Sequence, residues 1–337
     1  MTVPVSRSDL PGLGVVHRPR SRARHLTGLA LTGIATGLAA PLARRSLVRL
    51  GAMDVANHRS SHTDPVPRGG GLAALVGCAV GMTVLGRATP RSLVGLGMLA
   101  TAGFADDLRS KRGGVPASHR LAAQITAGTL LAGPGGQPWA SLGGALTTTG
   151  VVNVVNFMDG INGISGMTAV VWGLNAMAGP VPDTAAVGAL AAGAGLGFLP
   201  WNVPRAQLFL GDVGSYLFGG LMATGMLSSL GKAGRLRGAI AVGAPLLPYA
   251  ADAAQALIRH RLAGGSLTEP HRDHVYQRLV DEHRLTHVQV AGAHAGVAAL
   301  NAIAWRRCPA PVALATSGAV CAGWIALPDV LRRKDSV

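Results

Sequence analysis

Long apolar runs separated by short polar segments are the feature that most constrains this chain. About eleven runs recur, at residues 26–43, 70–86, 91–105, 120–134, 139–155, 163–180, 184–202, 208–230, 236–258, 287–305 and 310–327. A helix that crosses a bilayer needs roughly 20 apolar residues. Only 13% of the residues are charged, against about 25% in soluble domains. We therefore predict an all-α integral membrane protein, a polytopic bundle of ten to eleven transmembrane helices.

The two ends differ from the central part of the chain. Residues 1–25 are basic and aperiodic, and no small-residue cleavage site follows the next apolar stretch. We predict a disordered tail there and not a signal peptide. Residues 26–327 form the transmembrane domain, and residues 328–337 form a short basic C-terminal tail. Three cysteines lie in or beside apolar runs without metal-ligand spacing, which is typical of packing residues.

The net charge of +15 raises the alternative of nucleic-acid binding. Aromatic residues make up only 4% of the chain, and no base-stacking motif accompanies the basic residues. Basic residues of membrane proteins gather in cytoplasmic loops and near anionic headgroups. The charge therefore predicts a bilayer partner and no nucleic acid.

Loop parity predicts the orientation of the bundle. With eleven spans, the loops after spans 1, 3, 5, 7 and 9 share one side with the C-terminus and contain nearly every polar cluster. That side has 18 of the 30 Lys and Arg residues, the other side has 7, and the N-terminal tail has 5. Positive-inside counting makes the cluster side cytoplasmic, although the basic tail argues the other way.

Two adjacent aspartates, Asp106 and Asp107, follow the third run in Gly-Phe-Ala-Asp-Asp-Leu-Arg. Neighbouring carboxylates at a helix end repel each other unless a cation or proton lies between them. A solvated helix terminus near Arg109 and Lys111 explains the pair equally well when the motif is taken alone. The other polar clusters favour a functional site.

The fifth run ends in polar side chains at intervals of three: Asn153, Asn156, Asp159 and Asn162. If the segment is helical, this spacing places them along one face. Amide and carboxylate oxygens suit a hard cation such as Mg²⁺, or hydrogen bonds to a sugar or base. Amides that join helices explain one or two of these residues, but not readily all four.

Asp212 stands early in an apolar run, in the segment Phe209-Leu-Gly-Asp-Val-Gly-Ser. An isolated buried carboxylate protonates more readily than it ionises. The flanking glycines allow a backbone or a ligand to approach closely. A metal ion is therefore the simplest partner for Asp212.

Two basic segments suggest phosphate contacts. Arg59, His62 and Arg68 precede three glycines at a helix start, where backbone N–H groups bind phosphate and arginine adds bidentate contacts.

The second basic segment is His271-Arg272-Asp-His274, in the longest loop. Its two histidines could bind zinc, but no cysteine or third close ligand completes such a site. Phosphate contact through histidine and arginine is favoured, and an ordinary solvated basic loop is the alternative.

Taken together, these motifs resemble the polyprenyl-phosphate N-acetylhexosamine-1-phosphate transferases, a family of integral membrane enzymes. The resemblance covers about residues 27–327. Five motifs occur in the family's order: Asn57-His-Arg-Ser-Ser-His with Pro-Arg-Gly-Gly-Gly, Gly-Phe-Ala-Asp-Asp, Asn-Phe-Met-Asp-Gly-Ile-Asn-Gly, Gly-Asp-Val-Gly-Ser, and His-Arg-Asp-His-Val-Tyr-Gln-Arg-Leu. Each motif is weak alone, but their order makes the resemblance specific.

The resemblance implies that a UDP-amino sugar and polyprenyl phosphate react with Mg²⁺, or Mn²⁺, to give polyprenyl-diphospho-sugar and UMP. Such a phosphotransferase would begin the synthesis of a cell-envelope glycan such as lipopolysaccharide, teichoic acid or arabinogalactan. It would be a multi-pass protein of the bacterial plasma membrane. A homodimer is compatible with the sequence, but no sequence feature indicates one.

The same resemblance implies roles for individual residues. Asp212 would be the chief metal ligand with Asn156 beside it, and Asp106 or Asp107 would interact with the lipid phosphate. Further expected contacts are Phe209 and Asn162 to uracil, and His271, Arg272 and His274 to the diphosphate. We also expect Asp159 among the catalytic residues, and Asn57, Arg59, His62, Arg68 and Asn153 among the substrate-binding residues.

Departures from the family's pattern narrow the substrate. The peptidoglycan member, phospho-MurNAc-pentapeptide transferase, has three histidines where this chain has His271-Arg-Asp-His274, which favours the GlcNAc-like or modified-hexosamine branch. Ser110 stands where a lysine is usual, which puts one phosphate contact in doubt. A muramyl substrate and an ion-coupled secondary transporter are the alternatives, but no half-to-half repeat of the kind transporters show is evident. A catalytically inactive scaffold is disfavoured by the intact aspartates.

Overall fold

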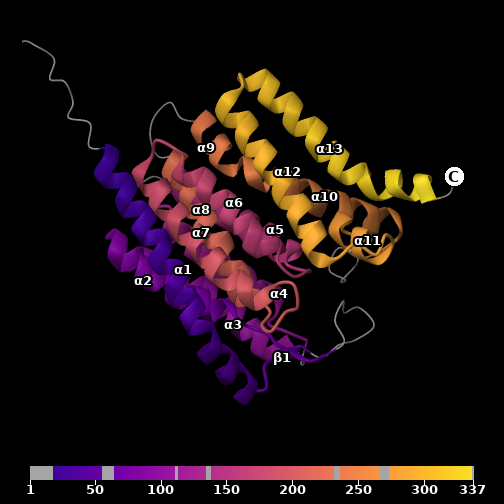
Figure 1. Ribbon diagram of the computed structural model, residues 1–337. Coiled ribbons are helices and arrows are strands. Elements are labelled where there is room, and N and C mark those ends of the chain that lie inside the picture. The colour runs from indigo at the N-terminus through magenta and orange to yellow at the C-terminus, as the bar shows by residue number, and fades with distance from the viewer. Residues whose placement is uncertain are drawn as a thin grey trace, which may run out of the picture.

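The computed structural model describes residues 18–54, 64–110, 113–133, 138–230, 236–265 and 273–335. Every predicted apolar run contains helix, so the all-α prediction is confirmed. The helices lie side by side along one diagonal of Figure 1, from α1 to α13. Their bounds are α1 Arg18–Arg49, α2 Gly71–Leu85, α3 Pro90–Arg109, α4 Ala117–Leu131, α5 Pro138–Met158, α6 Ile164–Met177, α7 Pro182–Asn202, α8 Gly211–Leu230, α9 Leu236–Gly243, α10 Leu247–Leu262, α11 Val275–Asp281, α12 His287–Arg307 and α13 Ala310–Asp335.

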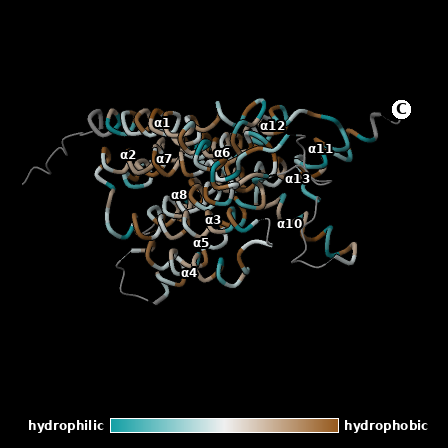
Figure 2. Tube along the Cα trace, turned by 90° about the horizontal axis from the view of Figure 1, so that it is seen from below, coloured by the Kyte–Doolittle hydropathy of each residue, from teal (hydrophilic) through white to brown (hydrophobic). Residues whose placement is uncertain are grey.

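Five of the described helices are long and apolar enough to cross a membrane. They are α1 (from Arg22), α7, α8, α12 and α13 (to Arg332); α2 and α6 are apolar but shorter. Figure 2 shows hydrophobic residues along much of the bundle, with hydrophilic residues around α11 and the C-terminal end of α13. Outward-facing side chains such as Leu38, 73% exposed, and Leu314, 65% exposed, suit contact with lipid. The chain is thus a helical membrane protein, and ten to eleven crossings stay a prediction.

Local signals set several helix ends. The Thr89 side chain accepts a hydrogen bond from Ser92 N–H, and Pro90 opens α3, where its missing N–H costs nothing. Thr286 and Gln289 form a capping box at the start of α12. Gly86 ends α2 in the left-handed conformation, with φ of 65°.

The run at 236–258, predicted as one span, is broken. It consists of α9, a 3₁₀ turn at Ala244–Leu246, and α10. Pro245 and Pro248 lack the N–H groups that a continuous helix would use, which accounts for the break.

Helix α8 is the centre of the bundle. It packs against α2, α3, α5 and α7, and most of its residues are buried. A Cβ on Gly71 would lie 2.2 Å from Gly214 Cα, so α2 and α8 cross at a distance that only glycine allows.

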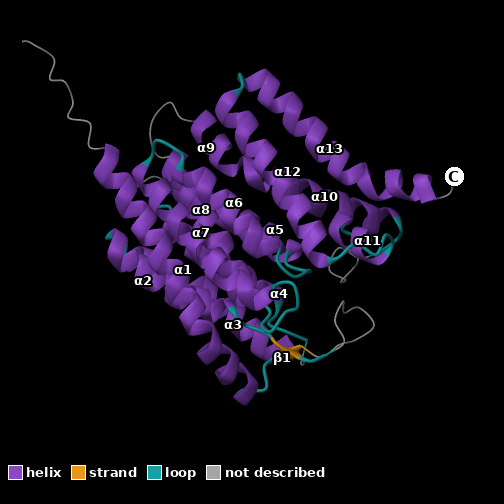
Figure 3. Cartoon of the chain, viewed as in Figure 1, coloured by secondary structure: helices purple, strands orange, loops and turns teal. Residues whose placement is uncertain are grey.

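Two chain ends differ from expectation. Helix α1 begins at Arg18, so residues 18–25 are helical where a disordered tail is predicted. Helix α13 likewise continues to Asp335, through most of the predicted C-terminal tail. A short antiparallel pair, β1 (Met53–Asp54) and β2 (Val66–Pro67), is orange in Figure 3 and precedes α2.

Candidate active site

Four predicted motifs meet at one end of the bundle. The segment before α2, the ends of α3 and α5, and the start of α8 bring Arg68, Asp107, Asn156 and Asp212 into a single hydrogen-bonded cluster. The sequence separations reach 144 residues. The prediction that these motifs share one site is therefore supported by direct contacts.

Arg68 lies between two aspartates. Its Nε donates to Asp107 Oδ1 at 2.7 Å, and a terminal nitrogen donates to Asp212 Oδ1 at 2.8 Å. Burial would lower the pKa of Arg68, but the charges of Asp212 and Asp107 outweigh it and raise the pKa. The guanidinium therefore stays charged and partly offsets the two carboxylates.

Backbone pairing fixes where Arg68 lies. Phe209 N–H donates to Pro67 C=O at 2.9 Å, and Phe209 C=O accepts from Gly70 N–H at 2.8 Å. Gly71 N–H donates to Leu210 C=O at 2.8 Å. The N–H groups of this glycine-rich helix start therefore donate to carbonyls of the chain just before α8, whereas the sequence predicted that they bind phosphate.

Asp107 holds the start of α8. Its Oδ1 accepts from Asp212 N–H at 2.9 Å and its Oδ2 accepts from Val213 N–H at 3.0 Å. These are N–H groups that the first turn of a helix cannot satisfy internally. Both Asp107 oxygens therefore have protein partners, whereas the resemblance implied a contact to the lipid phosphate.

Asn156 supports Asp212 from α5. Its amide nitrogen donates to Asp212 Oδ1 and to Ser215 Oγ, both at 3.0 Å. The predicted pairing of Asn156 with Asp212 is therefore present in the structure.

Asp106 points to a neighbouring loop and toward Arg120. Its Oδ1 accepts from Val115 N–H at 2.6 Å, and its Oδ2 lies 3.4 Å from a terminal nitrogen of Arg120. The two adjacent aspartates thus have different hydrogen-bond donors, although both also interact with Asp212.

The expected single face of Asn153, Asn156, Asp159 and Asn162 is wrong. Helix α5 ends at Met158, so only the first two residues belong to the helix. Asn153 donates to Gln124 Oε1 at 2.7 Å. Asn162 donates through Nδ2 to Pro204 C=O at 3.4 Å and through its backbone to His287 Nδ1 at 3.2 Å. Gly163, with φ of 89°, turns the chain into α6.

Asp159 lies in the connection between α5 and α6. Burial raises its pKa to about 7. The carboxyl group is close enough to Arg68, Asp107 and Asp212 to interact with all three electrostatically. It therefore borders the cluster and adds a group that titrates near neutral pH.

His274 immediately precedes α11, in the segment between α10 and α11. Its ring stacks on Tyr276, with centroids 5.3 Å apart. The Tyr276 hydroxyl donates to Phe157 C=O at 3.3 Å. A Cβ on Gly160 would lie 2.1 Å from that hydroxyl, so the tyrosine packs directly on the α5–α6 connection.

Several predicted contacts lie outside the described residues. They are Asn57, Arg59 and His62 of the first basic segment, and His271 and Arg272 of the second. Their assigned roles stay predictions.

The structure also adds residues that the motifs did not single out. Ser215 contacts Asn156, and Arg120 contacts Asp106. Ser215 follows Asp212 within its motif, so proximity could have indicated it. His287 contacts Asn162 across 125 residues, and no sequence signal marked that pairing.

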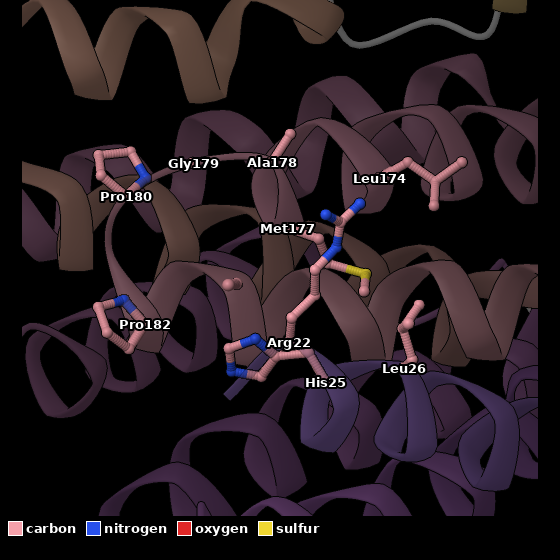
Figure 4. A pocket seen from close by; sticks show the side chains of 10 residues that line it. Arg22, His25, Leu26, Leu174, Met177, Ala178, Gly179, Pro180 and Pro182 are labelled. Carbon is pink, nitrogen blue, oxygen red and sulfur yellow. The ribbon is translucent and has the colours of Figure 1, made fainter. Parts of the chain in front are cut away.

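A separate cavity of about 720 Å³ opens at the other end of the bundle. Figure 4 shows its lining of Arg22, His25, Leu174, Met177 and neighbouring residues. Helix α6 leads from Asn162 to this cavity, a length of roughly 20 Å at 1.5 Å per residue. No motif residue lines it.

Within the described part of the chain, no three His, Cys, Asp or Glu side chains form a metal-binding group. Mg²⁺ does not need such a cage, because it commonly uses one or two carboxylates together with waters and substrate phosphates. Asp212, the Asn156 amide and the Ser215 hydroxyl supply a compatible set of oxygen-bearing groups.

Comparison with known proteins supports the family predicted from the motifs. Residues 91–230, which include the aspartates of α3 and α8, match the glycosyl transferase family 4 model. The chain is 30% identical to decaprenyl-phosphate N-acetylglucosaminephosphotransferase of Mycobacterium tuberculosis, over 76% of this chain and 74% of that protein. It is 29% identical to the Mycolicibacterium smegmatis protein of the same name, with the same coverage. A shorter match, 54% identical over 12% of this chain, joins it to phospho-N-acetylmuramoyl-pentapeptide-transferase of Mycobacterium sp. (strain KMS). The chain belongs to glycosyl transferase family 4, the polyprenyl-phosphate N-acetylhexosamine-1-phosphate transferases.

Proposed function

We propose that this protein transfers N-acetylhexosamine 1-phosphate, with GlcNAc as the expected sugar, from a UDP-sugar to polyprenyl phosphate and releases UMP. The observation that carries the proposal is the 30% identity, over three quarters of both chains, to a protein named decaprenyl-phosphate N-acetylglucosaminephosphotransferase. The acceptor would be a lipid of the undecaprenyl or decaprenyl type.

In this reaction an oxygen of the lipid phosphate bonds to the sugar-bearing phosphorus of the UDP-sugar. The bond from that phosphorus to the bridging oxygen breaks, and UMP leaves with the electron pair. The attacking phosphate is already ionised near neutral pH, so no strong general base is required. Catalysis then depends on positioning and on offsetting negative charge.

The chain's own groups suit that task. Arg68 is held on two sides by Asp107 and Asp212, so its charge is oriented before substrate arrives. Asp212 is held by Asn156 and Arg68. His274 stacks on Tyr276, which in turn contacts the α5–α6 connection.

Asp212 and Asn156 would hold Mg²⁺, with Mn²⁺ as a substitute. When bound, the ion would offset charge on the transferring phosphate. The Asn156 amide would rotate so that its oxygen, in place of its nitrogen, faced the ion.

The proposed site faces the cytoplasm of a bacterial cell, where UDP-sugars are made. The count of basic residues in the loops on that side supports this orientation. The reaction would initiate a cell-envelope glycan. The muramyl alternative has less support, because the match to that transferase covers only 12% of the chain. The transporter alternative does not account for the sequence identity of this chain to proteins named as phosphotransferases.

The test is release of UMP by purified protein given polyprenyl phosphate, Mg²⁺ and a panel of UDP-sugars. We expect UMP with UDP-GlcNAc and little with UDP-glucose or UDP-MurNAc-pentapeptide. Omission of the lipid phosphate is the control for simple hydrolysis. Protein that unfolds cooperatively on heating yet releases no UMP with any sugar would refute the proposal.

A further inference from the structure

Asp252 is a fully buried acid that lies outside the Arg68–Asp107–Asp212 cluster. It belongs to α10 and is 0% exposed. Its Oδ1 accepts from Val275 N–H at 3.0 Å and lies 3.1 Å from His274 Nδ1. Its Oδ2 accepts from Trp324 Nε1–H at 3.2 Å. A buried carboxylate is costly unless it is hydrogen-bonded, and these contacts come from the start of α11 and from α13.

The two oxygens of Asp252 have different tasks. Oδ1 contacts the Val275 N–H and the His274 ring, whereas Oδ2 contacts Trp324 of α13. A carboxylate on Nδ1 selects the tautomer or protonation state in which Nδ1 bears hydrogen, and it fixes the plane of the ring. The opposite ring nitrogen, Nε2, is then directed away from Asp252.

The neighbours of His274 connect it, through Tyr276, to the α5–α6 connection that borders the proposed reaction site. The stack on Tyr276 and the contact of Tyr276 with Phe157 and Gly160 join the loop to the α5–α6 connection. That connection includes Asp159. Hydrogen bonds join Asp252 to His274, the Val275 N–H and Trp324, and of these His274 is the group predicted to contact the substrate.

We propose that Asp252 is a positioning residue that orients His274 toward the phosphates of the substrate. The inference rests on the proposed function, since it assigns His274 to that reaction. Asp252 supplies the acceptor on Nδ1 through Oδ1, while its other oxygen accepts from Trp324.

Replacement of Asp252 by its amide makes a specific conflict. If the amide oxygen still accepts from Val275 and His274, the new NH2 group faces the Trp324 N–H, and both are hydrogen-bond donors. If the amide turns over, its NH2 group meets the Val275 N–H. Trp324→Phe removes the first conflict, so Asp252→Asn combined with Trp324→Phe can keep an oxygen on His274.

The experiment measures UMP release from UDP-GlcNAc and polyprenyl phosphate by the full chain and its variants. We expect Asp252→Asn to lose about tenfold or more in kcat, because relief of either donor conflict moves the amide oxygen from the position that orients His274. Trp324→Phe should stay within about threefold of wild type, and the double variant should return to about that level. A double variant no more active than Asp252→Asn, with the thermal stability of Trp324→Phe, would overturn the proposal.

A second arm separates positioning from general support of the fold. In a His274→Gln background, Asp252→Asn should have little further effect on activity, because both changes remove the same function. If Asp252→Asn lowers activity by the same factor in both backgrounds, Asp252 does not act through His274 and the proposal is wrong.

If wild-type protein releases no UMP, the proposed function is refuted, but the role of Asp252 in orienting His274 can still be tested by spectroscopy. In protein with ¹⁵N-labelled histidine, the His274 signal is identified by its loss in His274→Gln. It should show hydrogen on Nδ1 in wild type and Trp324→Phe, and a changed state in Asp252→Asn. Identical spectra for wild type and Asp252→Asn would overturn the proposal.

Discussion

The Asp107 carboxylate caps the helix that carries Asp212: it accepts the Asp212 N–H at 2.9 Å and the Val213 N–H at 3.0 Å. The end of α3 thereby fixes the start of α8. Asp107 and Asp212 look equivalent in the sequence, yet one supports backbone and the other presents a side chain that Arg68 and Asn156 hold. Substitutions of Asp107 and of Asp212 should therefore differ in their effects on stability and on turnover.

Asp107→Ala should reduce both stability and turnover. The change removes a cap and one of the two carboxylate partners of Arg68, at a cost of about 1–3 kcal/mol. Thermal unfolding of the purified protein measures the loss. An unchanged unfolding temperature would show that the cap is not needed to hold α8.

Asp212→Asn should abolish turnover while the protein stays folded. The amide can still accept from Arg68 through oxygen, so the unfolding temperature should change little. Loss of the charge should lower UMP release by about 100-fold or more, as removal of electrostatic stabilisation does elsewhere. Near-normal UMP release would remove Asp212 from its proposed role as metal ligand.

Close contact between α3 and α8 predicts a strong effect at Gly103. A Cβ there would lie 2.3 Å from the Asp212 carbonyl oxygen and 2.6 Å from Val213 N. Gly103→Ala should therefore destabilise the protein by about 1–3 kcal/mol and displace Asp212.

Gly97 is the matched control in the same helix. A Cβ on Gly97 would have no neighbour within 4 Å, and alanine favours helix by up to about 1 kcal/mol over glycine. Gly97→Ala should thus leave stability unchanged or raise it slightly. Equal losses of stability at both positions would show that contact with α8 is not what makes Gly103→Ala costly.

Much of the fold follows from the pattern of apolar runs, because each run is long enough for a helix and is bounded by glycine, proline or capping residues. The break at Pro245 and Pro248 was not predicted, since length and hydropathy outweighed the two prolines. The family resemblance implied that Asn156 lies beside Asp212, which the structure shows, whereas the contact of Arg68 with Asp212 was not predicted.

The partners within the site could not be read from spacing. Intervals of three predicted one face for Asn153 to Asn162, but the helix ends at Met158. Nothing in the sequence distinguishes Asp106 from Asp107, because their difference depends on which neighbouring backbone lies against each. The contact of Asp252 with His274 likewise depends on how α10 packs beside the last loop.

Asp159 predicts a dependence of stability on pH. Its folded pKa of about 7 exceeds the roughly 3.9 expected of an unfolded aspartate, so the folded state binds the proton more tightly. The free energy of unfolding should therefore fall as the pH rises from about 4 to about 7, and then level off.

Asp159→Asn removes this dependence. In metal-free buffer, the variant should gain stability over wild type as the pH rises through that window, and the two should converge near pH 4 or below. Thermal unfolding at a series of pH values measures the difference. Parallel curves for the two proteins would contradict a raised pKa at Asp159.

The central claim is that a sugar and its phosphate move together. UDP-GlcNAc carrying ³²P only in its sugar-linked phosphate tests this most directly, with polyprenyl phosphate as acceptor and Mg²⁺ present. We predict that the label appears in the lipid fraction, in step with unlabelled UMP in the aqueous fraction, and that Asp212→Asn gives neither. If the label stays in aqueous UDP while sugar enters the lipid, or if folded protein transfers no label, the account is contradicted.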